Sequence, residues 1–111
     1  MQHKGTCRLL KYSNEDQTVV RVEGTHLAEE DALRLRDSLR EMVDAGHFRL
    51  SVDLGNVLFL TSTTVEILLG LDRQLKATGG HLSVFNLTPV VAEVFAVLKL
   101  KHVLDIREPA R

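Results

Sequence analysis

The sequence has few of the residues that cross-link a chain, and it has no segment suited to a membrane. Cys7 is the only cysteine, so neither an intrachain disulfide nor a cysteine zinc site can form. No apolar run approaches the roughly 18 residues that span a bilayer. The first ten residues also lack the apolar core of a secretion signal. We therefore expect a cytoplasmic protein with no inserted membrane segment.

The sequence also lacks an excess of either positive or negative charge. Lysine and arginine number 14 and aspartate and glutamate 15, which gives a formal net charge of −1. Without a basic excess there is little to neutralise a phosphate backbone, so nucleic-acid binding is not expected. What remains is typical of a globular protein, with 44% hydrophobic and 26% charged residues. We expect a single domain over residues 1–111.

Hydrophobic periodicity and turn signals divide the chain into strands and helices. Strands are expected at 7–13, 18–24, 48–54 and 81–87, with a short edge strand at 102–106. Helices are expected at 27–47, 62–78 and 88–100. The first two strands should form a hairpin, and strands joined through helices should run parallel. This order, ββαβαβα(β), predicts an α/β fold with a small mixed sheet of four to five strands packed with three to four helices.

Helical spacing also predicts which side chains face inward. In the first helix they are Ala28, Ala32, Leu35, Leu39 and Met42. In the second helix they are Leu68, Leu71 and Leu75, with Asp72, Arg73 and Lys76 facing outward and Gly70 at a close packing contact. In the third helix they are Val90, Val94 and either Val97 or Leu98, after a Thr88 cap and Pro89 at the first position.

The carboxyl ends of parallel strands meet at one edge of a sheet, where ligands and partners of open α/β sheets gather. Polar residues that follow three of the expected strands should lie there: Thr25, His26, Asn56, Asn86 and Thr88. The second helix begins at the same edge with four consecutive hydroxyl side chains: Thr61, Ser62, Thr63 and Thr64. We predict that these nine residues form a partner-binding surface.

The hydroxyl run has two interpretations. Thr63 and Glu66 fit a capping box, in which each side chain accepts a hydrogen bond from the other residue's backbone N–H, and Ser62 could be the cap instead. A cap contributes about 1 kcal/mol but explains only one of the four hydroxyls. Alternatively, the free N–H groups and dipole of a helix start favour phosphate, which would add roughly −1.5 to −2 charge.

The order of several segments resembles the STAS domains of bacterial anti-sigma factor antagonists, from about Val19 to Ile106. The matching segments are "SVDLGNVLFL", "TSTT", "ATGGHLSVFNLTPVVAEVF" and "LKLKHVLDI". In that family an Asp-Ser-Ser-Gly motif opens a helix, and its first serine, the phosphoacceptor, aligns with Ser62. Here Thr61, Thr63 and Thr64 stand where the family has aspartate, the second serine and glycine, so Thr61 or Thr63 could substitute as acceptors.

This resemblance implies a function without catalysis. The unphosphorylated domain would bind an anti-sigma factor with serine kinase activity and so release a sigma factor. Phosphorylation at Ser62 would abolish binding, and a serine phosphatase would restore it. The alternative is a STAS subunit of a membrane lipid ABC transporter, in which the same helix start docks on the ATPase.

Other candidate residues point away from enzyme chemistry. The histidines are scattered without the spacing of metal ligands: His3, His26, His47, His81 and His102. Asp53 should tie loop N–H groups, because no nucleophile–histidine pair is evident nearby. Cys7 should be a small core residue. We therefore predict no enzyme activity, no metal and no cofactor.

Overall fold

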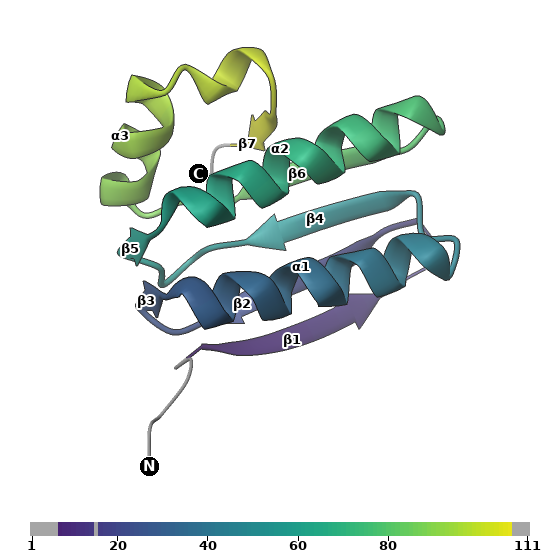
Figure 1. The fold of residues 1–111 in the computed structure, drawn as a ribbon, viewed down its shortest axis with the longest axis horizontal. Coiled ribbons are helices and arrows are strands. Elements are labelled where there is room, and N and C mark those ends of the chain that lie inside the picture. Colours follow the sequence, from purple (N-terminus) through teal and green to yellow (C-terminus); the bar gives the residue numbers. More distant parts are fainter. Residues whose placement is uncertain (1–6, 15, 108–111) are drawn as a thin grey trace.

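The computed structural model describes residues 7–14 and 16–107. Its helices are α1 (Glu29–Asp44), α2 (Ser62–Ala77) and α3 (Pro89–Val97), followed by a 3-10 turn, η1 (Leu100–His102). Its strands are β1 (Arg8–Ser13), β2 (Thr18–Glu23), β3 (His26–Leu27), β4 (Arg49–Asp53), β5 (Phe59–Leu60), β6 (His81–Phe85) and β7 (Asp105–Arg107). Figure 1 shows their arrangement.

The main sheet has five strands in the order β1-β2-β4-β6-β7. β1 and β2 form the expected antiparallel hairpin, and the remaining neighbours run parallel. The predicted mixed α/β fold is therefore confirmed. The last strand is also present at the sheet edge, at Asp105–Arg107 rather than 102–106, because η1 takes up the residues before it.

Two very short strands were not expected from the sequence. β3 and β5 have two residues each and pair in parallel as a separate sheet. The backbone N–H of Leu58 adds a hydrogen bond to the carbonyl of Thr25 at 2.8 Å. A two-residue strand shows no periodicity, so only the fold reveals that the loop after β2 is tied to the loop before α2.

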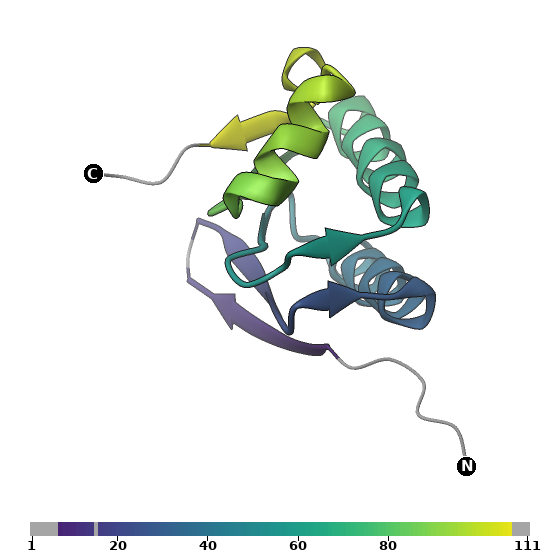
Figure 2. The same ribbon diagram turned by 90° about the vertical axis from the view of Figure 1, so that its left-hand side faces the viewer.

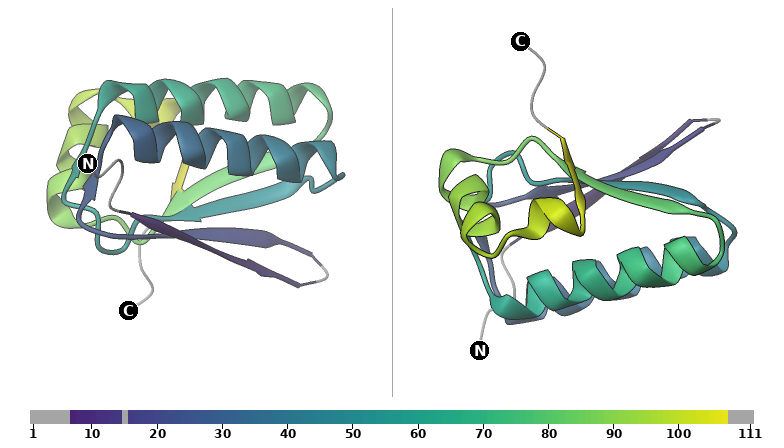
Figure 3. Two further views of the ribbon diagram at one scale, coloured as in Figure 1. Left: turned by 60° about the horizontal axis from the view of Figure 1, so that its bottom comes forward. Right: turned by 90° about the horizontal axis from the view of Figure 1, so that it is seen from above.

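The core lies between the main sheet and the pair α1 and α2, which lie side by side on one face of the sheet (Figure 3). One row of register partners on the sheet consists of Val20, Val52, Val84 and Ile106. The predicted inward residues of α1 are buried except Ala28, which precedes the helix as its N-cap. The three predicted inward leucines of α2 are buried as well.

Two expectations for α2 were wrong. Asp72 does not face solvent: it is buried, and its carboxylate forms an ion pair with Lys76 at 3.0 Å, which compensates for its burial. Gly70 does not mark a close contact, because a Cβ at this position would meet nothing within 4 Å. It lines an open groove between α1 and α2.

The predicted inward face of α3 was also wrong. Val91 and Phe95 are the buried residues, while Val90, Val94, Val97 and Leu98 are exposed. Almost every position of this helix is apolar, so more than one face fits the pattern. The observed rotation buries Phe95, the largest of these side chains, which removes the most apolar surface from water. Thr88 caps the helix as expected, with its hydroxyl accepting from the Val91 N–H at 3.3 Å.

Within residues 7–14 and 16–107, no helix is long and apolar enough to cross a membrane. His3 and the tail from 108 to 111 lie outside the described residues.

Candidate partner-binding site

The loops that follow β2, β4 and β6 meet at one end of the molecule, where α1 and α2 begin and α3 lies beyond the strand ends (Figure 2). Hydrogen bonds join these loops. The Thr88 hydroxyl donates to the carbonyl of Val57 at 2.7 Å, and the Leu58 and Phe59 N–H groups donate to the carbonyl of Thr25. The end of the molecule is thus one connected surface built from three loops.

Asp53 holds part of this surface together. Its Oδ1 accepts the Gly55 N–H at 2.9 Å and the Asn86 side-chain amide at 3.0 Å. A Cβ on residue 55 would lie 2.5 Å from the Asn86 amide nitrogen, so a side chain there would displace Asn86 from its bond to Asp53. The expectation that Asp53 ties loop N–H groups is confirmed. Asn86 is exposed at the surface, but its side-chain amide is already engaged in the hydrogen bond to Asp53.

The predicted capping box at the start of α2 was wrong. Thr61 is the N-cap residue, and its side chain makes no capping hydrogen bond. Thr63 lies inside the first turn, so its hydroxyl does not face the Glu66 N–H. It donates instead to Glu29 Oε2 of α1 at 2.8 Å. The helix begins directly after β5, and this tertiary pairing sets its first residue.

The four hydroxyl side chains have different environments. Thr64 is fully buried, so its predicted place at the partner surface is corrected. The hydroxyl oxygens of Thr61 and Thr64 are both inaccessible and have no hydrogen-bond partner among the described residues. Thr63 is half-buried and bonded to Glu29, whereas Ser62 is exposed. Of these four residues, only Ser62 is exposed.

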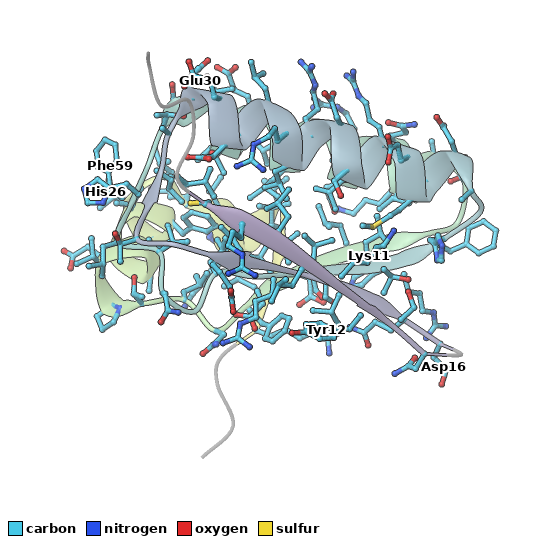
Figure 4. The ribbon with its side chains drawn as sticks, turned by 90° about the horizontal axis from the view of Figure 1, so that it is seen from below. Lys11, Tyr12, Asp16, His26, Glu30 and Phe59 are labelled. Atoms are coloured by element: carbon cyan, nitrogen blue, oxygen red, sulfur yellow. The ribbon has the colours of Figure 1, made fainter. Side chains whose placement is uncertain are left out.

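Of the other predicted surface residues, three are exposed: Thr25, His26 and Asn56. Thr25 and His26 are hydrogen-bonded to each other, and the His26 ring lies 5.6 Å from the ring of Phe59. Figure 4 shows these two rings projecting together from the end of the molecule. Thr88 is half-buried and serves the helix cap and the Val57 contact.

Sequence reasoning missed the apolar part of this end. Leu54 and Val57 anchor the loop in the core, and the chain then turns outward. We call four exposed side chains at this end the apolar end surface: Leu58 and Phe59 of this segment, and Val90 and Val94 of α3. The signal for the first two was the apolar run at 57–60, immediately before the hydroxyl run.

The start of α1 brings carboxylates to the same end. Asp31 is buried and accepts the N–H groups of Ala28 at 2.9 Å and Cys7 at 3.1 Å, so it joins the chain before β1 to the helix start. Cys7 is buried in the core, as expected. Glu29 and Glu30 are exposed. Across the described residues, no three histidine, cysteine or acidic side chains converge as metal ligands.

The sequence is similar to a known protein family and to a named relative. The family model described as "Mlab, STAS domain" matches residues 10–106. The Bordetella bronchiseptica protein BtrV, named as a candidate anti-sigma factor antagonist, is 32% identical over 83 residues, which is 72% of each chain. The chain belongs to the STAS domain family, and its relatives place it among the anti-sigma factor antagonists of that family.

Solved structures share the fold. An anti-sigma factor antagonist from Mycobacterium paratuberculosis superposes with a TM-score of 0.81 at 22% identity, covering 95% of this chain and 87% of that one. The antagonist SpoIIAA in its unphosphorylated form gives a TM-score of 0.74 at 18% identity, with 95% and 90% covered. The Bacillus SpoIIAA in its phosphorylated form gives 0.73 at 20% identity, with 96% and 93% covered.

Proposed function

We propose that this protein is a non-catalytic anti-sigma factor antagonist of the cytoplasm. It binds a kinase-type anti-sigma factor through the end of the molecule around Ser62, which releases a sigma factor. Phosphorylation of Ser62 by that kinase lowers the affinity, and a serine phosphatase restores it. The observation that carries the proposal is the position of Ser62: of the four adjacent hydroxyl residues at the start of α2, it is the exposed one.

The surroundings of Ser62 explain how phosphate would change binding without unfolding the domain. A phosphate group adds roughly −1.5 to −2 charge at pH 7. The first N–H groups of α2 favour an anion at this place, so the fold can accommodate it. In support, the phosphorylated and unphosphorylated SpoIIAA structures match this chain almost equally, with TM-scores of 0.73 and 0.74.

The effect on a partner would be different. Partner contact at this end covers the exposed apolar side chains Leu58 and Phe59, which precede Ser62 by three to four positions. Covering a doubly charged group together with them is costly, because a buried charge without a counter-charge loses its hydration. Affinity should therefore fall on phosphorylation even though the domain keeps its shape.

The test uses the intact protein, its candidate anti-sigma kinase and ATP. We expect mass spectrometry to find phosphate on Ser62, and Ser62→Ala to bind the kinase but resist modification. Ser62→Glu should bind more weakly than Ser62→Ala. Absence of phosphate on Ser62 and on the neighbouring threonines would refute the switch.

A second candidate is the STAS subunit of a membrane lipid ABC transporter, which docks on the ATPase through the same end of the molecule. It is favoured by the matching family model, which is described as "Mlab, STAS domain". Stable copurification with a transporter ATPase, unchanged by Ser62→Glu, would support this candidate over the first.

A further inference from the structure

We propose that Glu29 restricts phosphorylation of the hydroxyl run to Ser62, by holding the side chain of Thr63. This inference rests on the proposed role of Ser62 as phosphoacceptor. It makes Glu29, a residue of α1, a specificity-determining residue for a modification on α2.

Burial alone does not select Ser62. The hydroxyl oxygens of Thr61 and Thr64 are inaccessible, which removes both from the reach of a kinase. Thr63 is only half-buried and lines the open groove between α1 and α2, together with Arg36 and Gln74. A kinase that reaches Ser62 would also find the next residue along the chain, so something other than burial must distinguish the two.

The hydrogen bond to Glu29 supplies that distinction. The Thr63 hydroxyl donates to Glu29 Oε2 at 2.8 Å, which directs the hydroxyl toward the first turn of α1. Phosphoryl transfer needs this oxygen to face the γ-phosphorus of ATP, so the bond to Glu29 must first break. A phosphate on Thr63 would then stand beside the Glu29 carboxylate, and like charges at this separation repel strongly. Both effects disfavour Thr63.

Ser62 escapes both effects. Successive residues of an α-helix point about 100° apart, so the Ser62 side chain does not follow Thr63 toward α1. Ser62 is also exposed. In the reaction, the bond between Ser62 Oγ and the γ-phosphorus forms as the bond to the departing ADP oxygen breaks. The hydroxyl proton passes to a base of the kinase.

The experiment compares the intact wild-type protein with Glu29→Ala and Glu30→Ala, each treated with the anti-sigma kinase and ATP. Glu30 is the matched control, since it is an exposed neighbour of the same type in the same turn of α1 (Figure 4). We expect the ratio of phosphothreonine 63 to phosphoserine 62 to rise by about tenfold in Glu29→Ala, which corresponds to 1.4 kcal/mol. Glu30→Ala should leave the ratio unchanged.

A second set of variants makes the outcome sharper. Ser62→Ala alone should be phosphorylated at Thr63 about tenfold more slowly than Ser62→Ala with Glu29→Ala. Equal rates in the two proteins, or an unmodified double variant, would overturn the role of Glu29 while leaving that of Ser62 intact. If wild type and every variant stay unmodified, the proposed function itself fails.

The contact can also be tested without a kinase. Amide hydrogen exchange in the first turn of α2 should speed up in Glu29→Ala and not in Glu30→Ala, because only the former loses the bond to Thr63. Equal exchange in the two variants would refute the contact on which the inference depends.

Discussion

Phe59 gives a direct measure of how much the apolar end surface contributes to partner binding. Its side chain is 53% exposed, although it belongs to β5 and its ring lies against His26. An aromatic side chain carries roughly 200 Å² of surface, so about 100 Å² is left for a partner to cover. At about 25 cal/mol per Å², covering this area contributes about 2.5 kcal/mol. Phe59→Ala should therefore raise the Kd for the anti-sigma factor by up to about 60-fold.

The same chain provides a matched control. Phe48 is 58% exposed, but it precedes β4 and lies at the opposite end of the sheet from Ser62. Isothermal titration of the anti-sigma factor should show weaker binding for Phe59→Ala and unchanged binding for Phe48→Ala. Both variants should unfold within about 1 kcal/mol of wild type, because each ring is largely in water. Equal affinity for Phe59→Ala and wild type, or an equal loss in both variants, would refute the assignment of this end as the partner surface.

Two further predictions concern the scaffold. Gly70→Ala should stabilise the protein by about 0.5–1 kcal/mol in thermal unfolding, because the added Cβ meets nothing within 4 Å and alanine favours the helix. Gly80→Ala is the control: its Cβ would lie 2.7 Å from the Phe48 carbonyl oxygen, so it should destabilise the protein. A loss of stability in Gly70→Ala would contradict the open groove at this position. The hydrogen bond from His81, helped by Arg107, holds the pKa of Asp105 below its usual value of 3.8. Because the folded-state pKa is the lower one, this stabilisation is present above the unfolded pKa and is lost as the pH falls through the folded pKa. Asp105→Asn should thus lower the free energy of unfolding by less than about 1 kcal/mol near pH 7. The difference in free energy between variant and wild type should shrink in acid. If this difference were the same at all pH values, the Asp105 carboxylate would not be its source.

Helices α1 and α3 show why a hydrophobic pattern predicts the buried face of one helix and fails for another. α1 has charged residues on every side except one, so only one rotation buries an apolar stripe, and the prediction for its inner face was confirmed at Ala32, Leu35, Leu39 and Met42. α3 is apolar over most of its surface, so several rotations bury a stripe and periodicity does not choose among them. The choice came from packing, through the volume of Phe95, and it left Val90 and Val94 in water.

Contacts across long sequence separations account for what the sequence missed at the site. The bond between Thr63 and Glu29 joins residues 34 positions apart. The pairing of β3 with β5 also joins distant parts of the chain, and strands of two residues are too short to show a periodic pattern. Both contacts position the start of α2. The start of α2 at residue 62 was predicted and is confirmed, but the threonine and glutamate at 63 and 66 also suggested a cap that this start excludes, because Thr63 then lies inside the first turn.

These contacts argue against the interpretation of the hydroxyl run as a cap for α2. If the run served to cap α2, the N-cap side chain should accept a hydrogen bond from a free N–H of the first turn, yet Thr61, the N-cap residue, makes no such bond. The hydroxyls of Thr61 and Thr64 are instead buried with no hydrogen-bond partner in the part of the chain that the structure describes, which costs roughly 1–3 kcal/mol for each. Thr63 is engaged by α1. Helix capping therefore does not explain the exposed Ser62, which is the residue that the proposed contact with a partner and its kinase requires.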